Sequence, residues 1–169
     1  MMDCDIETDG ILYSVLIIGC NRGLGLELFR FLLGLKKPPR YVFATCRDLD
    51  ACSALKADNV LWNSRKTKVR ILRLEVNNDS DIADVVTAVE EDLDGVGLSV
   101  LINNAETHTR KNLDSVTSVD MKKTFETNTI SPVMIAKAFR SILSSFVLLG
   151  SKETESNGYA AIVNISSVL

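Results

Sequence analysis

Histidine and paired cysteines are scarce in this chain, and their scarcity excludes two classes of site. His108 is the only histidine, and the four cysteines form no C-x-x-C pair. A zinc site needs several thiolate or imidazole ligands at short spacings, and a thioredoxin-like site needs the C-x-x-C motif. We therefore expect no metal site. The cysteines are expected to be free thiols in a reducing cytosol, at Cys4, Cys20, Cys46 and Cys52.

An excess of basic residues and a long apolar run are also missing. Nineteen lysines and arginines stand against 22 acidic residues, and the formal net charge of −3 disfavours nucleic-acid binding. The short basic run at 65–73 alternates with apolar residues in its second half, which is typical of a solvated strand edge. No segment approaches the roughly 20 apolar residues of a membrane span. Residues 1–10 are acidic, unlike a signal peptide, and are expected to be a flexible N-terminus of a cytoplasmic protein.

What the chain does contain is the alternating pattern of an α/β protein. Its 169 residues suffice for one domain with a sizeable core and are too few for two ordinary domains. Strand-like apolar runs alternate with segments long enough for a helix, which predicts a Rossmann-type, doubly wound parallel sheet over residues 11–169, with about five strands and helices on both faces. The expected strands are residues 12–18, 41–45, 69–74, 98–102 and 160–165.

The expected helices follow from apolar periodicity and from capping residues. One helix follows the capping candidates Asn78, Asp79 and Ser80 and ends near Leu93. The segment 117–149 predicts a long helix that is interrupted near Ser131-Pro132, because proline removes a backbone donor. Two further helices are expected at 24–35, which is apolar nearly all round, and at 48–57, and a polar surface loop is expected at 151–158.

A glycine-spaced turn stands between the first strand and the first helix. Gly19, Gly23 and Gly25 follow the spacing G-x-x-x-G-x-G, and Leu24 stands where a phosphate-loop motif needs glycine, which disfavours a nucleoside triphosphatase. Glycines let backbone N–H groups approach a pyrophosphate, and the helix N-terminus and Arg22 add positive charge. The turn therefore predicts nucleotide binding. A turn that needs glycine only for steric reasons is the alternative.

Further motifs follow in order along the same alternation. They are Leu-Ile-Asn-Asn-Ala at 101–105, Asn-Thr-Ile-Ser-Pro at 128–132 and Ile-Val-Asn-Ile-Ser-Ser at 162–167. With them the chain resembles the short-chain dehydrogenase/reductase superfamily from residue 12 to residue 169. Residues 17–27 and 44–48 look most like the C-factor or sniffer type of carbonyl reductase. The resemblance implies hydride transfer between NADP(H) and a small carbonyl compound. Charge and the lack of a long apolar run already predict no nucleic-acid or membrane partner.

The resemblance also implies roles for single residues. Asn128 matches the asparagine that organises a proton-relay water, and Ser167 matches the serine that binds the substrate carbonyl, with Ser166 as the competing candidate. Glu106 replaces the family's glycine after Asn-Asn-Ala, where a positive φ would make a side chain costly. The implied cofactor-binding residues are Gly19, Asn21, Arg22, Gly23, Leu24, Gly25, Arg47, Glu75, Val76, Asn103, Asn104 and Ala105.

The end of the second strand bears on the choice between NAD(H) and NADP(H). NAD sites place an acid about 20 residues beyond the glycine motif, whereas a 2′-phosphate requires a cation. Arg47 stands in that region and Arg22 can reach the same phosphate, so NADP(H) is expected. Asp48 is the competing residue, because a shift of one position in the turn would aim its carboxylate at the ribose.

One element of the resemblance is missing from these 169 residues. Complete family members carry Tyr-x-x-x-Lys after the serine, but Tyr13, Tyr41 and Tyr159 are followed four residues later by isoleucine, threonine and valine. The tyrosine handles the substrate proton and the lysine lowers its pKa. We therefore expect no turnover from this chain and assign His108 no catalytic role. The alternative function is an inert nucleotide-binding or dimer-interfering module. The homodimer of complete members is not carried over to this chain.

Overall fold

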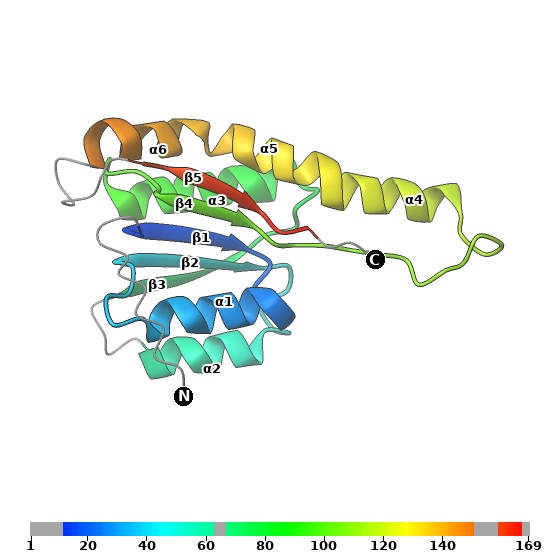
Figure 1. The fold of residues 1–169 in the computed structure, drawn as a ribbon, viewed down its shortest axis with the longest axis horizontal. Helices are drawn as coiled ribbons and strands as arrows, with labels where there is room; N and C mark the ends of the chain where they lie inside the picture. The colour runs from blue at the N-terminus through cyan, green and yellow to red at the C-terminus, as the bar shows by residue number, and fades with distance from the viewer. Residues whose placement is uncertain (1–11, 63–66, 151–158, 167–169) are drawn as a thin grey trace.

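A parallel sheet between two helical layers forms the molecule (Figure 1). The computed structural model describes residues 12–62, 67–150 and 159–166. Its five strands lie in the order β3-β2-β1-β4-β5. The strands are β1 (Ser14–Ile18), β2 (Tyr41–Cys46), β3 (Lys68–Arg73), β4 (Val100–Asn103) and β5 (Ala161–Asn164). The helical elements are α1 (Gly23–Gly34), α2 (Ser53–Trp62), α3 (Asp79–Leu93), α4 (Ser118–Phe125), α5 (Ser131–Ala138) and α6 (Arg140–Ser145), with π-helical segments η1 (Glu126–Ile130) and η2 (Phe146–Gly150).

The central strand β1 is buried on both faces. Its residues pair in parallel with β2 and with β4, for example Leu16 with Phe43 and with Leu101. Val15 and Ile17 pack with the cluster under α1, whereas Leu16 and Ile18 pack with the cluster under α3 and α5. A strand covered on both faces must be apolar throughout, which is why β1 is an unbroken run of apolar residues in the sequence. The predicted doubly wound α/β fold is confirmed.

Helices α1 and α3 form close to where the sequence predicts them. Phe29 and Leu33 of α1 are buried, but Leu24 and Phe31 are about half exposed, at 53% and 51%, so the helix is covered on one side only. For α3, Asn78 is the N-cap, and its side-chain oxygen accepts from the N–H groups of Ser80 at 2.9 Å and Asp81 at 3.1 Å. The capping prediction is therefore confirmed for Asn78.

Helix α2 begins later than predicted. Its first residue is Ser53, and it continues to Trp62 instead of covering 48–57. The preceding residues form a turn because the Asp48 carboxylate accepts from the N–H groups of Asp50 at 2.8 Å and Ala51 at 3.4 Å. An aspartate that pairs with the backbone two residues on stabilises a turn in competition with a helix.

The predicted interruption near Ser131-Pro132 is present as the π-helical segment η1, which ends directly before Ser131, but the sharp bend of the long helix lies at Phe139. The chain stays helical through Pro132 because the preceding turn widens: the Ser131 N–H bonds to the Glu126 carbonyl five residues back, and Pro132 stands in the first turn of α5. At Phe139 the backbone leaves helical values, with φ −86° and ψ 1°, while its side chain is buried in the core.

Within the described residues, no single helix is long and apolar enough to cross a membrane. The two segments Ser118–Ala138 and Arg140–Leu148, which meet at an angle of 52°, pass the length and composition test only as a pair. Ile135, Phe139 and Ile142 of this pair are buried in the core beside the sheet. Core helices commonly show such composition.

The edge strand β3 carries the basic run. Lys68 and Arg70 form ion pairs with Asp92 of α3 at 2.8 Å and 2.9 Å. Although partial burial opposes ionisation of Asp92, the hydrogen bonds from Lys68 and Arg70 hold its pKa below the usual value. The interpretation of the run as a solvated strand edge is confirmed for 68–73. The predicted N-terminal segment 1–10, the predicted loop at 151–158 and Ser167 lie outside the described residues.

Candidate cofactor-binding site

The glycine turn between β1 and α1 is tightly packed at two of its three glycines. Gly19 has φ +86°, and a Cβ there would lie 2.9 Å from the Ala105 Cα. A Cβ on Gly25 would overlap the Gly19 carbonyl oxygen and lie 2.5 Å from Asn104 Nδ2. Gly23 has φ +59°, but open space surrounds its Cβ position. The turn therefore packs against the β4 loop on one side and is open at Gly23.

Hydrogen bonds from the neighbouring strands hold the turn in place. The Gly19 N–H donates to Thr45 Oγ1 at 3.0 Å, and the Cys20 N–H donates to the Thr45 carbonyl at 2.7 Å. Asn104 Nδ2 donates to the Gly19 carbonyl at 2.7 Å. Asn104 and Ala105 thus support the turn from behind. Thr45 is an additional supporting residue that sequence analysis did not assign, although a hydroxyl ending a buried strand beside β1 was the available signal.

The N-terminus of α1 has no side-chain cap within the described part of the chain. Arg22 is the N-cap residue, with extended backbone angles of φ −164° and ψ 173°, and the first turn contains no acidic residue. By contrast, Asn78 caps α3 and Thr117 caps α4. Asn21, Arg22, Gly23 and Leu24 are all exposed, so solvent reaches this end of the helix. Uncapped N–H groups and the helix dipole together favour an anion at this position.

The ends of β2 and β3 place one cation and one acid close together. The Arg47 side chain is 73% exposed, and its Nε lies 3.9 Å from Glu75 Oε2. Asp48 uses its carboxylate for the turn described above, which leaves the guanidinium of Arg47 as the outward group. Glu75 is partly buried, and its N–H donates to Asp81 Oδ2 at 2.8 Å. Val76 packs in the core, so its side chain does not line the exposed surface.

The structure tests two residues at and just after the end of β4: Asn103, with an implied part in cofactor binding, and Glu106, which replaces the family's glycine. Asn103 is buried, and its Nδ2 donates to Asn164 Oδ1 at 2.9 Å, which joins β4 to β5. Its Oδ1 is buried and has no partner among the described residues. Glu106 is exposed and does not have a positive φ, since Asp94 is the only described non-glycine residue that does. The backbone after Asn-Asn-Ala therefore accepts a glutamate without strain.

Asn128 lies in the π-helical segment η1 and is held by the loop after β4. Its Oδ1 accepts from the Thr107 N–H at 2.9 Å, and its Nδ2 donates to the Thr107 carbonyl at 2.8 Å. Pro132 carries no N–H, so the Asn128 carbonyl lacks the usual donor four residues later. Ser166 is exposed after the end of β5, and Ser167 lies outside the described residues. Among the described residues, the Asn128 side chain bonds to the Thr107 backbone and not to a serine.

A second set of polar residues anchors η1 to the loop after β3. Asn77 lies between Thr127 and Ser131, with its side-chain amide 3.0 Å from Thr127 Oγ1 and 2.5 Å from Ser131 Oγ. Ser131 Oγ also lies 2.8 Å from the Glu126 carbonyl and has one proton to donate. Asn77 Nδ2 donates to Thr127 Oγ1, whereas the single proton of Ser131 is within reach of two acceptors, Asn77 Oδ1 and the Glu126 carbonyl. Sequence analysis missed this network because its members are 50 residues or more apart in the chain.

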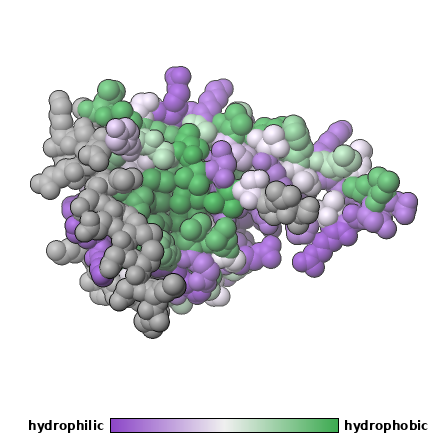
Figure 2. Space-filling view, viewed as in Figure 1, coloured by the Kyte–Doolittle hydropathy of each residue, from purple (hydrophilic) through white to green (hydrophobic). Residues whose placement is uncertain are grey.

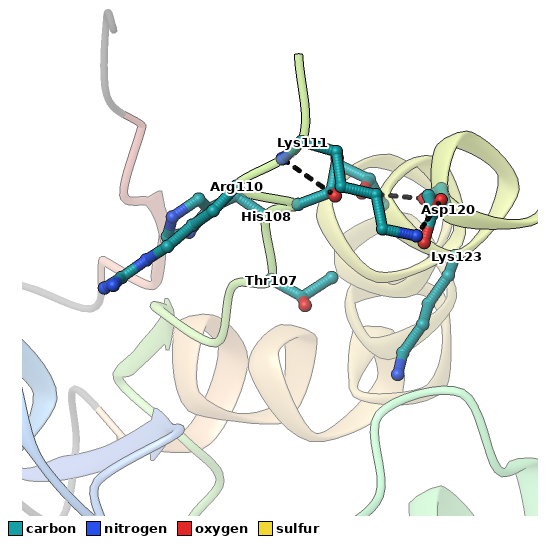
Figure 3. Close-up of a pocket in the computed structure, with 8 residues that line it drawn as sticks. Thr107, His108, Arg110, Lys111, Asp120 and Lys123 are labelled. Atoms are coloured by element: carbon teal, nitrogen blue, oxygen red, sulfur yellow. Dashed lines mark hydrogen bonds and ion pairs between the residues drawn. The ribbon is translucent and has the colours of Figure 1, made fainter. Parts of the chain in front are cut away.

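A hollow of about 400 Å³ lies between the loop 107–111 and α4 (Figure 3). Lys111 Nζ pairs with Asp120 Oδ2 at 2.8 Å, while the side chains of His108 and Arg110 point away from that pair. The hydrogen bond from Lys111, followed by those from Thr117, lowers the pKa of Asp120 to about 2. The labelled side chains do not converge on one point, so the hollow lacks the geometry of a catalytic site.

The parallel sheet, its braced glycine turn and the uncapped α1 define a Rossmann-type α/β protein with an open glycine turn at the carboxyl end of its central strand. Residues 13–169 match the family model described as short chain dehydrogenase. The chain therefore belongs to the short-chain dehydrogenase family.

Individual relatives agree with this assignment. The chain is 31% identical to human retinol dehydrogenase 8 over 156 residues, which are 92% of this chain and 44% of that protein. It is 35% identical to the structure of carbonyl reductase Sniffer of D. melanogaster, with a TM-score of 0.82 over 92% of this chain and 62% of that one. It is 36% identical to the NADPH-bound carbonyl reductase from chicken fatty liver, with a TM-score of 0.79 over 92% of this chain and 57% of that one.

These comparisons confirm the resemblance to sniffer-type carbonyl reductases. They also show that the chain spans a little under half the length of the curated relatives it matches and about 60% of these two solved chains.

Proposed function

We propose that this chain is the cofactor-binding part of an oxidoreductase that transfers hydride between NADPH and a small carbonyl compound. The observation that supports it best is the uncapped N-terminus of α1 behind a glycine turn that three hydrogen bonds hold in shape. Such a turn fits a pyrophosphate, because its N–H groups are preorganised and no side-chain oxygen competes for them. The nicotinamide ring supplies the hydride when the cofactor is bound.

The side chains at the end of β2 favour a cofactor with a 2′-phosphate. Arg47 is largely exposed and only loosely paired with Glu75, at 3.9 Å, so its guanidinium is available for bidentate contact. Asp48, the residue that would favour the ribose hydroxyls of NAD(H), accepts hydrogen bonds from its own turn. The NADPH found in the chicken carbonyl reductase supports the same choice.

The proposal assigns binding, but not turnover, to these 169 residues. Asn128 is the residue proposed to organise a proton-relay water, and Ser167, with Ser166 as the alternative, is proposed to bind the carbonyl oxygen. No tyrosine of the sequence is followed four residues later by lysine, so the general acid of the family has no counterpart here. An inert nucleotide-binding module is the alternative function that this observation favours.

The test is a titration of the purified chain with NADPH and with NADH, followed by fluorescence. Arg47→Ala removes the cation, and we expect it to weaken NADPH binding about tenfold or more, in line with the loss of a charge-assisted contact to phosphate, while NADH binding changes little. Asp48→Asn keeps the size of its side chain and is the matched control. An equal loss for both cofactors in Arg47→Ala would contradict the assignment of Arg47. Absence of NADPH binding by the folded wild type would contradict the function itself.

A turnover assay separates the two functions. Steady NADPH oxidation with a carbonyl substrate by this chain would show that another residue replaces the tyrosine. Saturable NADPH binding without oxidation would support the inert module for the chain as it stands.

A further inference from the structure

Two cysteines lie side by side at the base of the turn that carries Arg47. Cys46 is the last residue of β2, and Cys52 directly precedes α2. Their Sγ atoms are 3.0 Å apart, with the Cys46 thiol directed at the Cys52 sulfur. The Cys52 thiol in turn donates to the Leu49 carbonyl at 3.1 Å. Both are free thiols, and neither has a part in the proposed binding of the cofactor.

We propose that Cys46 and Cys52 are a redox modification site that forms a reversible intramolecular disulfide. A disulfide needs its sulfurs about 2.05 Å apart, so the pair has only about 1 Å to close. The residues that must move are Arg47, Asp48, Asp50 and Ala51, which are exposed and lie outside the sheet. The movement therefore shifts a surface turn and leaves the buried strand in place.

Cys20 has a different environment and serves as an internal comparison. Like Cys46 and Cys52 it is buried, but its thiol donates to the Ile17 carbonyl at 3.4 Å. No sulfur of the described residues is its hydrogen-bond partner. Cys20 should therefore remain a thiol under conditions that couple the other two.

The chemistry requires a two-electron oxidant, for which we name hydrogen peroxide. The Cys52 sulfur gives up its proton and attacks one peroxide oxygen, the O–O bond breaks, and the products are a sulfenic acid at Cys52 and hydroxide, which takes up that proton to become water. The Cys46 sulfur then attacks the sulfenic sulfur. The S–O bond breaks, and the hydroxyl leaves with the Cys46 proton as a second water. Two thiols are oxidised to one disulfide, and one peroxide is reduced to two waters.

The order of the two steps follows from the surroundings of Cys46. Burial, followed by the contact with Cys52, raises the pKa of Cys46 to about 12, so at neutral pH it stays a protonated thiol. A protonated thiol is a poor nucleophile toward peroxide. Because the Cys46 thiol is also the donor in its contact with the Cys52 sulfur, we assign the first oxidation to Cys52 and the resolving step to Cys46.

The disulfide would close a short loop that contains both Arg47 and Asp48. These are the two residues that the proposed function uses to distinguish NADPH from NADH. Oxidation would fix the turn in one shape, whereas the reduced turn is held by the hydrogen bonds of Asp48 and Cys52. The modification itself does not depend on nucleotide binding, so the two proposals can fail separately.

Peptide mapping of the oxidised protein tests the site directly. The chain is prepared with Cys4→Ser, treated with a small excess of hydrogen peroxide, denatured, alkylated and digested with trypsin. Arginine at 40 and 47 and lysine at 56 place the two cysteines in separate peptides, 41–47 and 48–56. We expect these peptides to be recovered as one disulfide-linked pair, which dithiothreitol separates, while Cys20 is recovered alkylated.

Two variants test the order of the steps in the same background. Cys46→Ser should leave a sulfenic acid at Cys52 that dimedone labels, and Cys52→Ser should leave Cys46 unlabelled. Recovery of both peptides alkylated after oxidation, or a link from either peptide to Cys20, would overturn the proposal. Because the main measurement uses the native pair and no nucleotide, neither a misfolded variant nor a failure to bind NADPH changes its meaning.

Discussion

Gly25 is the residue at which the cofactor turn tolerates no side chain. Its Cβ position overlaps the Gly19 carbonyl and lies 2.5 Å from Asn104 Nδ2, so alanine must push apart the α1 turn and the β4 loop. Overpacking of this kind costs about 1–3 kcal/mol. We expect Gly25→Ala to destabilise the fold by that amount and to weaken NADPH binding about tenfold or more, measured by urea unfolding and by fluorescence titration.

Gly95 provides the control for this variant. It has φ +83°, and its Cβ position meets no neighbour, so Gly95→Ala adds backbone strain far from the cofactor turn without crowding. It should lose stability but keep NADPH affinity. If the two variants bind NADPH equally well, glycine is not required at position 25 because of the nearby Gly19 carbonyl.

Asp120 makes the stability of the α4 start depend on pH. Its pKa in the folded protein is about 2, below the ordinary value of 3.8, because Lys111 and Thr117 stabilise the carboxylate. A lowered pKa means that the contribution is full above about pH 4 and is lost as the pH falls toward 2. The difference in melting temperature between wild type and Asp120→Asn should therefore shrink over that range. Asp114→Asn, at an exposed position of the same loop, is the control and should show no such convergence.

The glycines of the cofactor turn could be found from the sequence because their spacing is local. Thr45 and Asn77 could not be assigned, because their roles arise from partners on other strands and helices. Thr45 bonds to the Gly19 N–H across the sheet, and Asn77 bonds to residues 50 and more positions away. The sequence could not settle whether Glu106 is strained, because strain there depends on its φ angle, which only the structure gives.

The segment η1 depends on the buried hydroxyl of Ser131. Ser131 is 3% exposed and lies within hydrogen-bond distance of both Asn77 and the Glu126 carbonyl. Ser131→Ala removes a hydroxyl whose partners Asn77 and Glu126 are exposed residues that water can reach, so the cost is that of an ordinary hydrogen bond, about 0.5–1.5 kcal/mol. We expect a loss of this size in urea unfolding. The exposed Ser141 of α6 is the matched control, and a loss as large in Ser141→Ala would show that the network adds no stability.

At the scale of elements, the sequence predicts the order and type of most helices and strands but not all of their internal breaks. The alternation of strands and helices follows from apolar runs that both faces of a parallel sheet require. The bend at Phe139 and the widened turn at η1 depend on how one long helix packs along the sheet, which apolar spacing alone does not record. The late start of α2 depends on the carboxylate of Asp48, which favours a turn over a helix.

The molecule as a whole leaves one edge of its sheet uncovered within the described residues. Strand β5 pairs only with β4, and all four of its residues are exposed. Figure 2 shows a hydrophobic area over this part of the molecule, where Ile162 is 45% exposed, Val163 40% and Ile165 41%. An open strand edge with apolar side chains is a template for pairing with another chain.

Because the β5 edge is open, we expect copies of the chain to associate with one another as the protein concentration rises. Val163→Lys places a charge on β5, where edge strands of stable proteins commonly carry lysine, and should raise the concentration at which association begins. Thr87→Lys adds the same charge on the exposed side of α3 and controls for net charge. Light scattering over a concentration series measures the onset for both variants. If Thr87→Lys shifts the onset as far as Val163→Lys does, net charge and not the β5 edge limits association. A shift confined to Val163→Lys identifies β5 as the surface through which copies meet.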